Sequence, residues 1–306
     1  MREELLFYGV VDGLAPNGRC DLHAHKKGAV EDHRLTSSSV FWRPYIEERL
    51  RPTYMTPDDG PVVALLGARC VEHNLLTHTA HYSFTGTPIS PPTPSRADVP
   101  SSASSTLGSF PIKQDPQSYA CVATHCAGII GAERSGPFSG LAPNCKLLCL
   151  QVISNEGFGT TSSIIKSIKF AMQQKVQIIC IPLSFQFDKA NAKHVELREL
   201  LLEAARNDIL LIAAIISAEK CFPADEAFVC SVVAFNKKHE LSEPSVCSAD
   251  VAAPGESIWS LHPPILEEPT RQYCRMSGVA MATSMLAGLA ARLISRKSKN
   301  VIQSFF

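Results

Sequence analysis

Cysteine and histidine are the residue types in this 306-residue chain most suited to nucleophilic or metal chemistry. Cys121, His125 and Cys126 lie close together, and Cys145 precedes Cys149 by four residues. A thiolate beside an imidazole is a nucleophilic dyad, and the same groups bind zinc. However, dyad members normally meet through the fold, and neither group has the paired C-x2-C spacing of zinc modules. We therefore interpret these thiols as buried packing groups.

A looser group of histidines, His73, His78 and His81, follows a short apolar run. A surface loop explains this group as well as a set of metal ligands does. The sequence therefore predicts no metal site and no cofactor.

Composition narrows the class of protein and of partner. Hydrophobic residues make up 45% and charged residues 19% of the chain, as in globular proteins. Lys+Arg and Asp+Glu both number 29, so a zero net charge gives no support for nucleic-acid or membrane-surface partners. The expected partner is a peptide or another protein.

Cysteine usage and the N-terminus indicate the compartment. The 11 cysteines are odd in number and sit mostly in apolar runs. The first residues show no signal-peptide pattern, and the longest apolar run, Ile209 to Ile216, is too short to span a membrane. We expect reduced, buried thiols in a cytoplasmic protein.

The elements that must position any site alternate between strand-like and helix-like patterns. Short continuous apolar runs predict strands buried on both faces, and apolar residues at helical spacing predict the helices between them. This alternation predicts an α/β fold with a doubly wound parallel sheet. The expected strands are 62–66, 146–153, 176–183, 209–216 and 228–235, and the expected helices are 162–174, 193–207 and 278–294.

The chain divides by composition into three parts. Residues 1–61 are a weakly patterned N-terminal segment of uncertain structure, and residues 297–306 form a C-terminal tail. The domain itself is expected over 62–296. Within it, residues 82–118 are rich in Pro, Ser and Thr and predict a low-complexity loop insertion.

Four stretches carry a family pattern in a fixed order. They are Ala123-Thr-His-Cys-Ala-Gly-Ile-Ile-Gly131, Ser139-Gly-Leu-Ala-Pro-Asn-Cys-Lys-Leu-Leu148, Asp250-Val-Ala-Ala-Pro-Gly-Glu-Ser-Ile-Trp259 and Ser277-Gly-Val-Ala-Met-Ala-Thr-Ser-Met-Leu-Ala-Gly288. Together they resemble the subtilisin-like serine proteases, or subtilases, over roughly residues 62–294. The resemblance implies the subtilase type of α/β fold. It also implies a Ser-His-Asp triad with an oxyanion-hole Asn.

The positions that match the family's catalytic residues are degenerate. Ala280 stands at the nucleophile, Val122 at the general base and Gly67 at the aspartate. Ser217 stands at the oxyanion position, where its hydroxyl could donate a hydrogen bond, but from a shorter side chain than that of asparagine. Four changes at separate places indicate a scaffold that has lost this chemistry, with no catalytic group intact.

Other hydroxyls near the nucleophile position are weak substitutes. Ser277 and Ser284 lie three and four residues from Ala280, so their hydroxyls would have to reach the same point from another place on the helix. We interpret them as helix-capping and packing residues.

The resemblance also implies a substrate-binding edge. Asn155, Gly157, Phe158 and Gly159 occupy the place of the segment that pairs with the substrate backbone, although a plain glycine-rich turn explains them equally well. Ser184 lies on the opposite wall, where the adjacent Phe185 is expected to narrow the specificity pocket.

Three functional hypotheses follow. The first is a pseudoprotease that binds peptides or proteins or regulates them. The alternative is a divergent serine endopeptidase with its triad elsewhere. The third is a structural scaffold without a ligand, in which Phe158 or Phe185 fills the groove.

Overall fold

The computed structural model describes residues 5–9, 22–26, 60–85, 116–134, 138–154, 157, 159–216, 221–236, 241, 249–263 and 272–303. Asn155, Phe158 and Ser217 lie outside these ranges, as do the central part of the Pro/Ser-rich insertion and most of the N-terminal segment.

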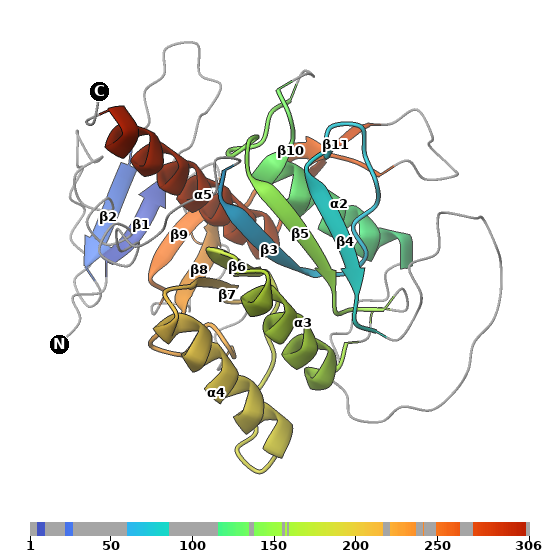
Figure 1. Ribbon diagram of the computed structural model, residues 1–306, viewed down its shortest axis with the longest axis vertical. Coiled ribbons are helices and arrows are strands. Elements are labelled where there is room, and N and C mark those ends of the chain that lie inside the picture. The colour runs from blue at the N-terminus through green and yellow to red at the C-terminus, as the bar shows by residue number, and fades with distance from the viewer. Residues whose placement is uncertain are drawn as a thin grey trace.

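A mostly parallel sheet forms the centre of the fold and confirms the predicted α/β class (Figure 1). Its seven parallel strands run in the spatial order β9-β8-β7-β6-β3-β5-β4. The strands are β3 (Val62–Gly67), β4 (Thr79–Ser83), β5 (Lys146–Gln151), β6 (Ile178–Ile181), β7 (Leu210–Ala214), β8 (Cys230–Phe235) and β9 (Val251–Pro254). In the N-terminal segment, β1 (Leu5–Gly9) pairs in parallel with β9, and β2 (Leu22–Lys26) pairs antiparallel with β1.

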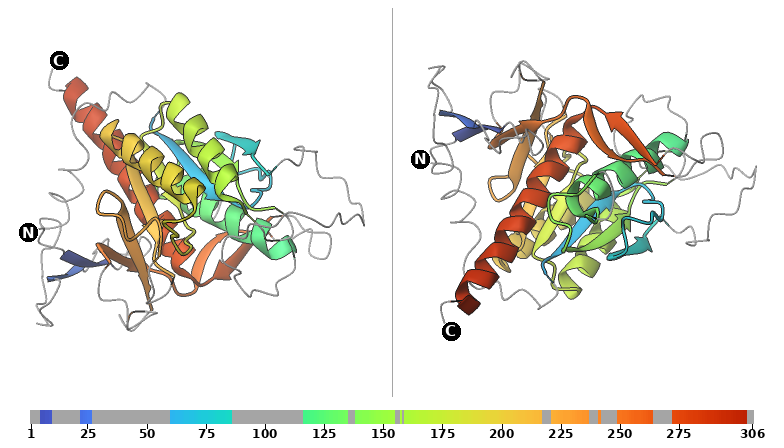
Figure 2. Two further views of the ribbon diagram at one scale, coloured as in Figure 1. Left: turned by 90° about the horizontal axis from the view of Figure 1, so that it is seen from below. Right: turned by 90° about the horizontal axis from the view of Figure 1, so that it is seen from above.

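Two helical layers cover the two faces of the sheet. Helices α3 (Thr161–Gln173) and α4 (Ala192–Arg206) cover one face, and α2 (Pro116–Gly131) and α5 (Val279–Gln303) cover the other. Figure 2 shows α3 and α4 nearest the viewer in its left view, and α5 with α2 in its right view. Helix α5 continues beyond residue 297, where the sequence predicted a tail.

Alternation along the strands builds a separate apolar core on each face. In β3, Val63 and Leu65 join the core under α2 and α5, whereas Ala64 and Leu66 join the core under α3 and α4. Successive strand residues point to opposite faces, so a continuous apolar run supplies both cores at once.

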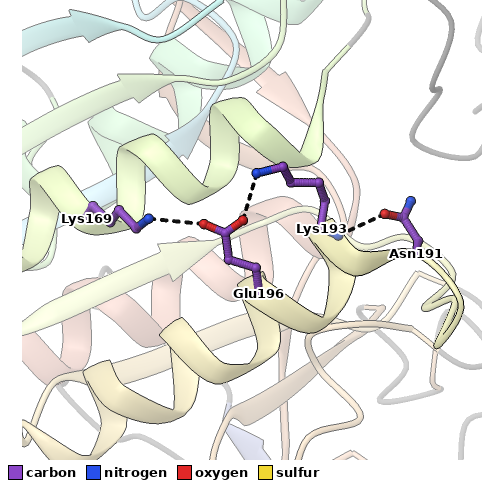
Figure 3. A network of polar contacts seen from close by, with 4 residues as sticks. All are labelled: Lys169, Asn191, Lys193 and Glu196. Atoms are coloured by element: carbon purple, nitrogen blue, oxygen red, sulfur yellow. Dashed lines mark hydrogen bonds and ion pairs between the residues drawn. The ribbon is translucent and has the colours of Figure 1, made fainter.

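Helices α3 and α4 begin at side-chain caps. Thr160 and Asn191 each accept a hydrogen bond from a first-turn backbone N–H. Glu196 bridges the helices by accepting from Lys193 at 2.8 Å and Lys169 at 3.1 Å (Figure 3), and these contacts lower its pKa, the one to Lys193 most. Exposed ion pairs contribute little, so the buried residues between the helices and the sheet hold this layer.

A small hairpin, β10 (Ile258–Leu261) with β11 (Tyr273–Met276), packs on α2. The Ser260 hydroxyl donates to the His125 carbonyl oxygen at 2.8 Å. Gly128 permits this approach, because a Cβ there would lie 2.4 Å from the Ser260 Oγ. The sequence patterns predicted neither this hairpin nor α2, β4 and β9. Among the described helices, none combines the length and apolar character that a membrane crossing requires.

Candidate functional site

The three positions that match the triad meet where two helices approach the end of a central strand. Gly67 ends β3, Val122 lies in α2, and Ala280 lies in the first turn of α5. A Cβ on Gly67 would lie 4.0 Å from the Cβ of Ala123, so this position has room for a side chain. Helix α2 contacts α5 here, with the Cys126 Sγ 3.6 Å from the Ala280 carbonyl oxygen. The end of β3, α2 and α5 therefore come together around these three positions.

Neighbouring hydroxyls do not complete a triad at this point. Ser284 is fully buried and donates to the Ala280 carbonyl oxygen at 2.8 Å. The Ser277 hydroxyl accepts from the Ser257 backbone N–H at 2.8 Å. In the described part of the chain, no serine hydroxyl is hydrogen-bonded to a histidine ring. These contacts agree with the capping and packing roles expected for both serines.

The histidine that the family motif retains belongs to the structural core. His125 is fully buried, and its Nε2 lies 3.0 Å from the Ile258 carbonyl oxygen on the hairpin. Burial lowers the pKa of His125 to about 4 and raises the pKa of Cys126 to about 12. A neutral imidazole and a protonated thiol do not form an activated dyad, which agrees with the packing interpretation.

The segment expected to bind peptide forms a compact turn. Gly157 adopts a φ of +85°, and its N–H donates to the Ser154 carbonyl oxygen at 3.0 Å. A Cβ on Gly157 would lie 2.5 Å from the Tyr119 ring, and Gly159 forms an antiparallel bridge with Ile153. The expectation that the Gly157 N–H is available to a peptide is therefore corrected, because the turn itself uses this donor.

The opposite wall also differs from expectation at one residue. Ser184 is buried, with 3% of its surface exposed. Phe185 exchanges two backbone hydrogen bonds with Phe222, and its ring packs against Phe222 and His194 at 5.3 and 5.2 Å between centroids. The ring lies in the core under α3 and α4. The prediction that Phe185 narrows a specificity pocket is therefore wrong, as is the groove-filling role considered for it.

A further cluster, which the sequence patterns did not reveal, lies beyond the end of β3. Cys70, His81 and Cys149 place their sulfur and ring-nitrogen atoms within 4.8 Å of one another. The pKa of Cys70 is lowered to about 6, mainly because its side chain forms a hydrogen bond with the Cys149 thiol. The Cys70 thiol in turn raises the pKa of His81. His81 was expected in a surface loop, but it lies in β4. Recognising the cluster requires the pairing of β4 with β5.

Comparisons with curated proteins identify serine proteases. Thermitase of Thermoactinomyces vulgaris is 29% identical over 187 residues, which cover 58% of this chain and 63% of thermitase. The major intracellular serine protease of Bacillus subtilis (strain 168) is 32% identical over 189 residues, covering 58% of this chain and 56% of that protein. The chain thus matches between half and two thirds of the length of these relatives.

Solved structures agree on the fold. The prenylagaramide maturation protease PagA has a TM-score of 0.57 at 22% identity, covering 80% of this chain and 78% of PagA. The self-cleaved protease domain of PatA has a TM-score of 0.56 at 20% identity, covering 79% and 84% respectively. A family model described as the subtilase family matches residues 113–303, which is more than half of the sequence. With the ordered motifs and the parallel sheet, this match shows that the chain belongs to the subtilase family.

Proposed function

We propose that this chain is a subtilase domain that has lost peptidase chemistry and acts as a peptide- or protein-binding, regulatory module. The observation that carries the proposal is Ala280, which places a methyl group where the family's nucleophilic hydroxyl would lie. Val122 offers no base to activate a nucleophile, and Gly67 offers no carboxylate to orient one. In subtilisin, loss of the triad lowers turnover by about a million-fold.

A fluorophosphonate probe that labels activated serines tests the loss of catalysis, with thermitase as the positive control. We expect no labelling of the wild-type chain and no peptide hydrolysis. The Ala280→Ser variant is also expected to stay unlabelled, because Val122 cannot take the proton of the new hydroxyl. Labelling of the wild type at Ser277 or Ser284 would contradict the proposal. It would support the alternative, a divergent serine endopeptidase.

Peptide binding is proposed at the surface around Gly67, Val122 and Ala280, here called the cleft, and needs no catalytic group. In open α/β sheets, ligands bind beyond the carboxyl ends of the strands, which is where Gly67 lies. Val122 and Ala280 are partly exposed and pack against the same buried clusters, so they offer a partly exposed apolar surface. Main-chain groups of an extended peptide need no catalytic side chain as a partner.

Two arginine substitutions, each measured against a library of random extended decapeptides, locate the binding surface. Ala280→Arg places a long charged side chain in the cleft, so peptides selected on the wild type are expected to bind at least tenfold more weakly. Val195→Arg adds the same charge at an exposed position on α4, across the sheet from α5, and is expected to bind normally. Thermal unfolding verifies that both variants are folded. Normal binding by Ala280→Arg would place the interaction outside the cleft.

We also infer a reducing, cytoplasmic location and no nucleic-acid or membrane partner. Support comes from the nine described cysteines, which are all buried and form no disulfide with one another, and from the zero net charge. Two similar proteases carry "intracellular" in their names. Thiol counting on denatured, unreduced protein is expected to find nearly all cysteines free. Two or more disulfides would contradict this location.

A further inference from the structure

The side chains of Cys70, His81 and Cys149 converge at one edge of the sheet. His81 in β4 and Cys149 in β5 are direct neighbours in the parallel register. Cys70 approaches them from the connection between β3 and β4. This connection is held against α2 because the Val71 N–H donates to the Thr124 Oγ1 at 3.0 Å. The strand pairing and this loop contact therefore position the cluster from three separate segments.

The cluster lies at a pocket with room for an ion. Cys70 and Cys149 are 5% and 4% exposed, and His81 is half-buried. The pocket has a volume of about 40 Å³, which exceeds the space that one water molecule needs. Its lining also includes the polar residues Glu72 and Gln151 and the cationic residue Arg69. The site thus combines two thiols and an imidazole with space for a further, oxygen-containing ligand.

One ring nitrogen of His81 lacks a hydrogen-bond partner within the described residues. The Nδ1 of His81 is buried and makes no hydrogen bond. Buried polar atoms are almost always paired, so such an atom requires a physical explanation. A metal ion bound at Nδ1 would supply the partner.

We propose that Cys70, His81 and Cys149 bind one thiophilic divalent metal ion of the Zn²⁺ class. Zn²⁺ takes thiolate and imidazole ligands tetrahedrally at about 2.3 and 2.0 Å, which places two sulfurs and one nitrogen about 3.5–3.8 Å apart. The ligand atoms here lie within 4.8 Å of one another, so closing by about 1 Å completes the geometry. Two thiolates and one imidazole leave a fourth position, which faces the pocket and takes water or the Glu72 carboxylate.

Other buried thiols on the same face of the sheet lack this arrangement and define the control. Cys145 is 2% exposed and belongs to the same apolar core as Cys70 and Cys149. It is not part of the cluster within 4.8 Å, and burial raises its pKa to about 12. Substitution of Cys145 therefore removes a buried thiol without removing a proposed metal ligand.

Metal binding is measured on the full chain, stripped with a chelator and kept reduced, with Zn²⁺ alone as the probe. We expect one equivalent of bound Zn²⁺ and a rise in the thermal unfolding midpoint on its addition. Cys70→Ser and Cys149→Ser are each expected to weaken binding at least tenfold and to lose the thermal shift. Cys145→Ser is expected to retain both. Equal binding by all three variants would overturn the proposal.

A second measurement needs no substitution and so does not depend on the folding of a variant. Co²⁺ bound to the wild-type chain is expected to give the sulfur-to-cobalt charge-transfer band of two thiolates and the visible bands of tetrahedral coordination. A spectrum without thiolate ligation would overturn the proposal. A Cys70–Cys149 disulfide in protein isolated without reductant, with no Zn²⁺ binding after its reduction, would overturn it as well. None of these results depends on whether the cleft is catalytically active.

Discussion

The Ser284 hydroxyl donates a 2.8 Å hydrogen bond to the Ala280 carbonyl oxygen, one turn earlier in α5. The one buried serine of this helix turn is thus bonded along its own helix to Ala280, the residue that matches the family's nucleophile. This contact explains why Ser284 serves helix packing and does not replace the missing hydroxyl.

Substitution of Ser284 by alanine is expected to change little. The variant loses a hydrogen bond worth about 0.5–1.5 kcal/mol, but alanine has the higher helix propensity. We expect the free energy of unfolding, measured in urea, to stay within about 1 kcal/mol of the wild type. Peptide binding should also persist. A change in probe labelling between wild type and Ser284→Ala would show instead that this hydroxyl is reactive.

Protonation of His125 is expected to contribute to acid destabilisation. Its pKa of about 4 in the folded chain lies below the ordinary value of 6.5, so the neutral ring is favoured by folding. The associated stability is present above pH 6.5 and is lost as the pH falls toward 4, by about 3 kcal/mol. Unfolding of His125→Gln, measured across this range, should therefore show a shallower dependence on pH.

The control for this experiment is Val195→Gln, because Val195 is 40% exposed and carries no titratable group. This variant should keep the wild-type dependence on pH. If His125→Gln also keeps it, burial of His125 is not the source of the acid sensitivity.

Close packing at Gly128 predicts that a single methyl group is disruptive there. Gly128→Ala would place a Cβ 2.4 Å from the Ser260 Oγ and 2.7 Å from the Leu261 Cγ. Overpacking of this kind costs about 1–3 kcal/mol and outweighs the helix-propensity gain of up to about 1 kcal/mol. Denaturant unfolding should show a net loss of stability. Gly67→Ala is the matched control and should be tolerated, since its nearest neighbour lies 4.0 Å away.

The position of Phe185 predicts an effect on stability without an effect on binding. Phe185→Ala removes a ring that packs against Phe222 and His194 in the core, which costs about 3–5 kcal/mol. Peptide affinity, measured where the variant is still folded, should stay at the wild-type value because the ring lies in that core. Val195→Ala, at an exposed position on α4, should leave both quantities unchanged. A selective loss of peptide affinity in Phe185→Ala would instead show that this ring lines the cleft.

Local sequence patterns determined most of the parallel core. The runs at 62–66 and 146–153 correspond to β3 and β5, and the helix predicted at 193–207 differs from α4 by one residue at each end. These elements are predictable because their burial is periodic and their caps are local. The family resemblance likewise matched Ala280 within one motif, Val122 directly before another and Gly67 at the end of the first strand, because each match needs only local sequence.

Only the tertiary structure decided what surrounds the cleft. The cluster of Cys70, His81 and Cys149 depends on an edge strand too short and too polar to be predicted, and on the register that pairs it with β5. The face of the sheet against which the Phe185 ring packs depends on the direction of the chain as it leaves β6. A shift of one residue would turn the ring to the opposite face. Both outcomes depend on contacts between segments that are far apart in sequence. The local sequence pattern of a single segment does not encode such contacts.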